Sequence, residues 1–194
     1  IEDCAVALGS KIGNVHVGNY GICATFSFYA SKIMTCGTGG MFISKNKVLV
    51  NKALNYRDFD GVKEYYPRFN FQINDIQAAM GLAQFSKLKM FLDMRKEIST
   101  FYTRICNTRG WDFQKPLEDN MHPNWFRFVL KMDKGRILSL KNQLEKKEIQ
   151  TVIPIKQQTL LHNYLKLNPN NFPNAQKISE ETLSLPIYPG ILTS

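Results

Sequence analysis

The stretch "SFYASKIMTCGTGGMFIS", residues 27–44, places one lysine between a Ser/aromatic run and a glycine-rich turn. The apolar runs at residues 22–28 and 40–44 have the composition of β-strands. Lys32 is therefore predicted to lie in a tight connection between two strands, among small and apolar neighbours. The common explanation is a surface lysine in a hairpin loop. The alternative is a lysine that is kept neutral by its surroundings and forms a covalent bond with a carbonyl group.

Length and composition limit the class of protein. The 194 residues, 44% of them hydrophobic, suffice for one large domain or two small ones with a real core. The sequence has no apolar run of about 18 residues, so no membrane span is expected. Its first ten residues lack the pattern of a signal peptide. The chain begins without Met on what resembles the end of a strand, and we interpret it as part of something larger.

The formal net charge of +9 suits an anionic partner, such as nucleic acid, a phosphorylated cofactor or a nucleotide-linked substrate. The basic residues are dispersed, and solvated helix faces explain them more simply than a nucleic-acid groove does. A nucleic-acid-binding module therefore stays a rival supported by charge alone.

The cysteines and histidines also exclude classes of protein. The four cysteines form no CxxC pair, which favours a reduced, cytoplasmic protein. The three histidines are scattered without metal-ligand spacing, so no metal site is predicted. No convincing Ser/His/Asp set is present, and hydrolysis by a catalytic triad is disfavoured.

The rest of the pattern predicts an α/β chain. From Asn74 to Ile105, apolar residues return at helical spacing, which predicts one long helix that could link two domains. Asn74 and Gln77 resemble a capping box at its start. The following segments are predicted as a strand, a helix, a strand, a loop and a last helix: 125–132, 137–148, 150–155, 167–174 and 175–184. A domain boundary is expected near residues 105–112.

Five blocks then stand in a distinctive order: "EDCAVALGS" (2–10), "SFYASK" (27–32), "GTGGM" (37–41), "FNFQINDIQAAMGLAQ" (69–84) and "LSLPIYPG" (183–190). In order and spacing they resemble the signature blocks of the DegT/DnrJ/StrS family, the sugar aminotransferases that depend on pyridoxal 5′-phosphate (PLP). The resemblance implies the α/β, fold-type I, aspartate-aminotransferase-like architecture. Residues 1–108 would be the C-terminal part of the large PLP-binding domain with its long linking helix. Residues 109–194 would be the small α+β C-terminal domain.

The resemblance implies roles for four residues. Lys32 matches the lysine that binds PLP covalently and later shuttles a proton. Asp3 matches the aspartate that keeps the pyridine nitrogen protonated, and Ser27 the serine that binds the phosphate. Asn70 matches the asparagine that reaches the phosphate of the neighbouring subunit. Glu2, which points the other way along the strand, is predicted to be structural.

Each of these residues also has a plainer interpretation. Asp3 could be an exposed aspartate at a strand end, and Ser27 a strand serine bonded to backbone. Asn70 could be an ordinary loop asparagine.

The implied function is transfer of an amino group from an amino acid, glutamate, to a keto-sugar on a nucleotide carrier. Such a reaction belongs to amino-sugar biosynthesis for cell-surface polysaccharide, and the enzyme would be a cytoplasmic homodimer with shared active sites. Nucleic acid and membranes are not expected partners. Some relatives dehydrate sugars and have histidine in place of the lysine, so Lys32 favours transamination.

The sequence departs from the family pattern in four ways. Val6 stands where Gln or His is usual beside the cofactor, Gln72 where Arg or Lys is common, and Thr38 where Glu often occurs. The family's N-terminal half, which supplies further phosphate-binding residues and the side chain that stacks on the ring, has no counterpart here. The missing half and Val6 support an alternative, a non-catalytic truncated relative that acts only by docking to a partner. The strands that remain are expected to expose apolar surface.

Overall fold

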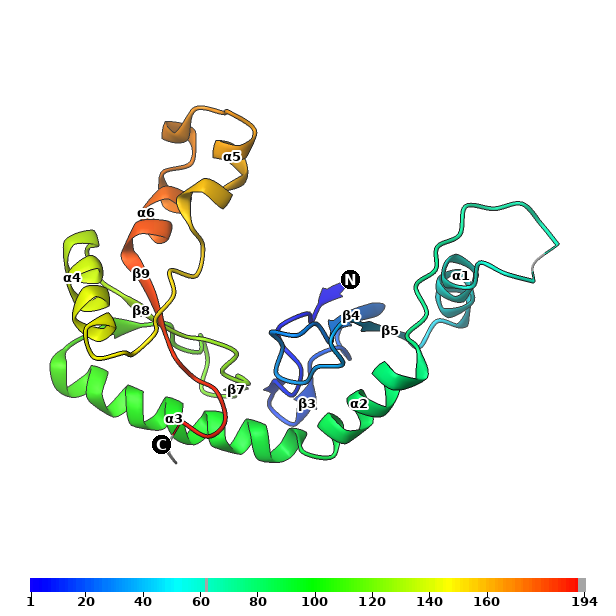
Figure 1. The fold of residues 1–194 in the computed structure, drawn as a ribbon, viewed down its shortest axis with the longest axis horizontal. Helices are drawn as coiled ribbons and strands as arrows, with labels where there is room; N and C mark the ends of the chain where they lie inside the picture. The colour runs from blue at the N-terminus through cyan, green and yellow to red at the C-terminus, as the bar shows by residue number, and fades with distance from the viewer. Residues whose placement is uncertain (62, 192–194) are drawn as a thin grey trace. The chain divides into compact units, whose positions relative to one another are not determined.

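A computed structural model describes residues 1–61 and 63–191, which form two compact units (Figure 1). Unit 1 comprises residues 1–93 and 116–126, and unit 2 comprises residues 94–115 and the chain from residue 127. The chain therefore leaves unit 1 within helix α3 (Leu88–Arg109). The predicted domains, 1–108 and 109–194, stay a prediction, because compact units record contacts and not independent folding.

The main sheet of unit 1 contains both strands predicted around Lys32. Its order is β1–β4–β5, with bounds Glu2–Asp3, Cys23–Ser27 and Gly40–Ser44. β1 runs parallel to β4, and β4 runs antiparallel to β5. A smaller sheet has the order β3–β2–β7, with bounds Val15–His16, Lys11–Ile12 and Met121–His122. The strand predictions at 22–28 and 40–44 are therefore confirmed to within two residues.

The core of unit 1 is built largely from small and sulfur-containing side chains. Phe28, Met34 and Cys36 form a buried cluster beneath the connection between β4 and β5. Burial raises the pKa of the Cys36 thiol, so it stays protonated. None of the described side chains of α1 (Lys47–Arg57) or α2 (Asp75–Phe85) is buried. Unit 1 thus exposes apolar surface on these helices, and the exposure predicted for the strands is seen on β5, where Met41 is 53% exposed.

Helix α2 begins as predicted. The Asn74 side chain accepts the backbone N–H of Gln77 at 2.9 Å, and the Gln77 side chain accepts the backbone N–H of Asn74 at 3.1 Å. This reciprocal pair satisfies two N–H groups at the helix start, which confirms the capping box.

The single long helix predicted from Asn74 to Ile105 is wrong, because the structure has two helices, α2 and α3. The Ser86 hydroxyl donates to the carbonyl of Ala83 at 2.9 Å. The N–H of Lys87 bonds to Gln84, three residues back, instead of continuing the α-helical ladder. The same bond from a serine hydroxyl to the carbonyl three residues back occurs at Ser99 inside the unbroken α3, so the Ser86 hydroxyl does not by itself account for the break.

Unit 2 is built around an antiparallel sheet of order β6–β8–β9, with bounds Asp112–Phe113, Phe128–Lys131 and Thr182–Leu185. Phe128 is fully buried at its centre, with the rings of Phe113 and Tyr102 at centroid distances of 5.1 and 5.2 Å. Ile98 of α3 and Ile137 of α4 (Lys134–Glu145) are also buried. Large apolar side chains therefore make this core.

Two predictions in unit 2 are wrong. The strand expected at 150–155 is reduced to a single bridge, between Val152 and Ser184. The helix expected at 175–184 is α6 (Pro173–Glu181), and the chain then continues as strand β9. Pairing of β9 with β8 overrides the local helical pattern, because strand state depends on cross-strand neighbours.

The remaining short elements of unit 2 are η1 (Gln157–Thr159), α5 (Leu161–Tyr164) and η2 (Pro169–Asn171). Across residues 1–61 and 63–191, no helix is both long enough and apolar enough to span a membrane.

Candidate functional site

Lys32 lies in the loop that joins β4 to β5 in unit 1. The backbone of Phe28 closes this loop, since its N–H donates to the Gly39 carbonyl at 2.9 Å and its carbonyl accepts the Cys36 N–H at 3.0 Å. Within the loop, the N–H of Lys32 donates to the Tyr29 carbonyl at 2.9 Å. The lysine is therefore held by a defined turn.

Apolar side chains surround this lysine on part of its surface. Ile33 and Met34, which follow it, are buried, whereas Lys32 itself is half-buried. Its Nζ lies 5.5 Å from the centroid of the Phe126 ring. The apolar neighbours predicted from the sequence are thus present, but solvent also reaches the side chain.

The glycines after the lysine allow the chain to reverse. Gly39 has φ +149°, and a Cβ on Gly40 would lie 2.7 Å from the backbone oxygen of Phe26. Only glycine avoids both the strained backbone and the clash. Between them and the lysine, the Thr38 hydroxyl accepts from the side chain of Gln77 at 2.9 Å, which ties the turn to the start of α2.

Asp3 and Ser27 share one face of the main sheet. Asp3 is paired with Thr25 in the parallel ladder, and Ser27 follows Thr25 by two residues on β4. Paired residues and residues two apart point to the same side, so the carboxylate and the hydroxyl lie on one face. Ser27 is paired with Gly40 of β5, which has no side chain on that face.

Both residues make short-range backbone bonds. Asp3 Oδ1 accepts the N–H of Ala5 at 3.0 Å, and Ser27 Oγ accepts the N–H of Tyr29 at 3.4 Å. These bonds agree with the plainer interpretations of the two residues. Within the described part of the chain, they leave Asp3 Oδ2 and the Ser27 hydroxyl proton available for a ligand.

Glu2 faces the opposite side of the sheet and organises residues 18–21. Its carboxylate accepts the N–H groups of Gly18 at 2.6 Å, Tyr20 at 2.7 Å and Gly21 at 2.5 Å. These bonds, that of Gly21 foremost, hold the pKa of Glu2 below its usual value. The structural role predicted for Glu2 is confirmed.

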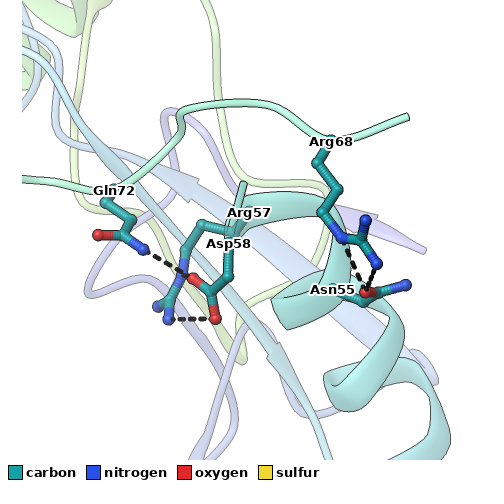
Figure 2. Close-up of polar contacts among 5 residues, drawn as sticks. All are labelled: Asn55, Arg57, Asp58, Arg68 and Gln72. Carbon is teal, nitrogen blue, oxygen red and sulfur yellow. Dashed lines mark hydrogen bonds and ion pairs between the residues drawn. The ribbon is translucent and has the colours of Figure 1, made fainter. Parts of the chain in front are cut away.

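Asn70 is exposed, in the extended segment that precedes α2. Contacts with α1 and its end fix the residues on either side of it (Figure 2). Arg68 donates to Asn55 Oδ1 at 3.1 and 2.9 Å, and Gln72 donates to Asp58 Oδ1 at 2.9 Å. Among the described residues, no hydrogen bond joins Asn70 to Lys32, Asp3 or Ser27. The structure thus brings three of the four predicted site residues to one sheet and its loop, and leaves Asn70 outside.

Gln72 has a local role in this anchoring. Arg57 donates to the same Asp58 Oδ1 at 2.8 Å, and together Arg57 and Gln72 lower the pKa of Asp58 (Figure 2). A neutral amide at residue 72 therefore completes a carboxylate contact, where the family commonly has a basic residue.

One buried polar residue that contacts the segment after β1 was not predicted from the sequence. Asn124 is buried in unit 1 and donates to the carbonyls of Val6 and Leu8, both at 2.9 Å. Its sequence signal is weak: a Pro-Asn turn pair ahead of two aromatic residues.

Comparison with known proteins gives the family. The sequence profile of the DegT/DnrJ/EryC1/StrS aminotransferase family matches residues 1–194. The chain belongs to this family. GDP-perosamine synthase of Escherichia coli O157:H7 is 32% identical over 157 residues, which cover 78% of this chain and 43% of that protein. The chain spans about half the length of the curated relatives it matches.

Solved structures give the same fold. The aminotransferase TlmJ of Streptoalloteichus hindustanus is 25% identical, with a TM-score of 0.83 over 98% of this chain and 53% of its own. The Helicobacter pylori aminotransferase PseC is 26% identical, with a TM-score of 0.81 over 96% of this chain and 53% of its own. The predicted α/β fold of the PLP-dependent sugar aminotransferases is confirmed for this part of their chain.

Proposed function

We propose that the intact protein is a PLP-dependent aminotransferase that acts on a nucleotide-linked keto-sugar. The observation that carries the proposal is the position of Lys32, half-buried in the closed loop that follows β4, whose Ser27 shares a sheet face with Asp3. In a family of aminotransferases, an amine held among apolar groups is suited to attack a carbonyl.

The side chains present fit PLP. An amine suits its aldehyde, a carboxylate suits its pyridine nitrogen, and a hydroxyl suits its phosphate. Gly40, paired with Ser27, has no side chain on that face. When bound, PLP supplies an electron sink that stabilises negative charge at the Cα of an amino acid.

Four residues of the chain have specific tasks in this proposal. Lys32 would hold the cofactor covalently through Nζ and would serve as the base that takes a proton from the donor's Cα. Asp3 accepts a hydrogen bond from the pyridine nitrogen and keeps it protonated. Ser27 donates to the phosphate. Val6 contributes apolar contact in place of a side-chain hydrogen bond.

Glutamate as amino donor and a nucleotide-linked keto-sugar as acceptor complete the proposal. Two relatives support a sugar substrate by name: a GDP-perosamine synthase and an aminotransferase of pseudoaminic acid biosynthesis. The net charge of +9 suits the pyrophosphate of such a substrate. The reaction would serve amino-sugar biosynthesis for cell-surface polysaccharide in the cytoplasm.

The test is transfer of labelled nitrogen from glutamate to GDP-linked and UDP-linked keto-sugars, followed by mass spectrometry with and without PLP. Transfer should require PLP. Lys32→Arg should abolish it, because a guanidinium stays protonated and cannot attack the aldehyde. Lys45→Arg, an exposed control in the same unit, should leave it unchanged. Transfer that survives Lys32→Arg would refute the assignment.

We further propose a homodimer in which Asn70 serves the phosphate of the neighbouring subunit, since no hydrogen bond in the described chain joins Asn70 to the other three residues. A Lys32→Ala chain mixed with an Asn70→Ala chain should then recover activity. One site of each heterodimer carries both lesions, and the other site is intact. If heterodimers form and activity stays at the level of the parents, Asn70 does not act across the dimer.

A non-catalytic docking protein is the second candidate. The observation in its favour is the apolar surface of unit 1, where Ile76 is 77% exposed and Phe71 is 67% exposed. Val6, which cannot hydrogen-bond a cofactor, agrees with it. A docking protein would bind a partner with no PLP-dependent chemistry, so the labelled-nitrogen assay separates the two candidates.

A further inference from the structure

We infer that Asn124 is a positioning residue for the site: it fixes the ring that faces Lys32 and the turn that follows Asp3. The inference rests on the proposed function.

The Asn124 side chain clamps the segment after β1. It is 8% exposed, and its Nδ2 donates to the carbonyls of Val6 and Leu8, both at 2.9 Å. Its backbone N–H donates to the hydroxyl of Ser10 at 3.0 Å. An amide NH₂ has two protons, so one short side chain satisfies two carbonyls at once. Residues distant in sequence are thereby locked together.

The clamped segment begins at Asp3. Asp3 Oδ1 accepts the N–H of Ala5, and the Cys4 carbonyl accepts the N–H of Ala7 at 3.0 Å. The N–H of Cys4 continues the sheet by bonding to Thr25 at 2.9 Å. The carbonyl of Val6, which Asn124 holds, therefore belongs to the same turn that the Asp3 carboxylate caps.

The side-chain oxygen of Asn124 fixes the conformation of the chain beside Lys32. Asn124 Oδ1 accepts the N–H of Phe126 at 3.0 Å, which forms a tight turn over Trp125. Trp125 has φ +50°, in the left-handed region that bulky side chains rarely adopt. Such strain persists where surrounding bonds enforce it, and it concentrates at functional sites.

The strained turn delivers the Phe126 ring to Lys32. The ring centroid lies 5.5 Å from Nζ, and the face of an aromatic ring attracts an ammonium and limits the rotamers of its side chain. One buried amide thus controls the surroundings of the two residues proposed for the chemistry, Lys32 and Asp3.

The plain alternative is that Asn124 only stabilises unit 1. A matched control is available in unit 2, where Asn163 donates to the Gln157 carbonyl at 2.9 Å and accepts from Gln176 at 3.4 Å. Asn163→Ala also removes a side-chain amide that joins separate segments, but in the unit that does not contain Lys32.

The experiment titrates the intact protein with PLP, traps the adduct with borohydride and quantifies it on the Lys32 peptide, beside a thermal melt of each variant. Asn124→Ala should raise the PLP concentration for half-maximal adduct roughly tenfold or more, because small misplacements of reacting groups are costly. Asn163→Ala should stay within about twofold of the unaltered protein, whatever its melting temperature.

Two further variants keep the test decisive if Asn124→Ala does not fold. Asn124→Asp keeps the size and the acceptor for Phe126 but loses both donors, and it should also raise the PLP concentration. Phe126→Leu keeps the clamp, removes the ring and should weaken labelling. If these variants reach half-maximal labelling of Lys32 at the same PLP concentration as the Asn163→Ala control, the inference is wrong. Absence of any adduct in the unaltered protein would instead contradict the proposed function.

Discussion

Unit 1 and unit 2 are held together in different ways. Phe128, Leu130, Ile137 and Leu183 are fully buried in unit 2. Among the described apolar side chains of unit 1, only the small ones of Ala24 and Cys36 are fully buried. Unit 1 relies more on side chains bonded to distant backbone, as at Glu2 and Asn124.

Because of this difference, we expect stability and activity to depend on different units. Apolar burial is the main source of folding free energy, so the core of unit 2 should govern its stability. The face of unit 1 that carries Asp3 and Ser27 contributes little to stability, and we propose that it binds a ligand together with Lys32 of the loop between β4 and β5. Substitutions on that face should therefore change activity, and substitutions in the core of unit 2 should change unfolding.

The largest expected effect is on activity in unit 1. Asp3→Asn should lower turnover about 10²-fold or more, because an amide cannot hold the charge of a protonated pyridine nitrogen. The amide oxygen can still accept the N–H of Ala5, so the melting temperature should hardly change. Steady-state kinetics and a thermal melt on the same preparation would measure both. Unchanged turnover would remove Asp3 from the site.

The next effect is on stability in unit 2. Phe128→Ala should lower the free energy of unfolding by about 3–5 kcal/mol, since it leaves a cavity between the rings of Phe113 and Tyr102. Leu161→Ala, at a side chain that is 69% exposed, should cost less than about 0.5 kcal/mol. Urea denaturation followed by fluorescence would measure both. Equal losses would mean that the core of unit 2 does not dominate its stability.

The smallest effect is a pH-dependent one at Glu2. The folded pKa of Glu2 is depressed, so its stabilisation is present above the pKa of the unfolded chain and is lost as pH falls through the folded pKa. Glu2→Gln should therefore lower the melting temperature at neutral pH, and the difference should vanish in acid. Thermal melts between neutral pH and about pH 3 would test this, since an ordinary Glu titrates near 4. A difference in melting temperature that grows as the pH falls would contradict this prediction.

Local features of the sequence predicted much of unit 1. The apolar runs of β4 and β5, the glycines at the turn and the Asn74–Gln77 box each lie within a few residues of the structure they specify. For Lys32 and Asp3, the signature blocks supplied the roles, and the strand register shows that Asp3 and Ser27 share a face.

Features that depend on distant partners could not be predicted. β9 continues the apolar pattern of α6, and only its pairing with β8 makes it a strand. Asn124 bonds to residues more than a hundred positions earlier, so no local motif reveals it. Apolar residues keep helical spacing on both sides of the break between α2 and α3, so the spacing pattern does not record the break.

The central claim is that Lys32 is the residue that binds the cofactor. The most direct measurement is to incubate the intact protein with PLP, reduce it with borohydride and map the modified peptide by mass spectrometry. The account predicts one adduct, on the peptide that contains Lys32, and its loss in Lys32→Ala. An adduct on Lys45, on Lys47 or on another lysine, or no adduct at all, would contradict it.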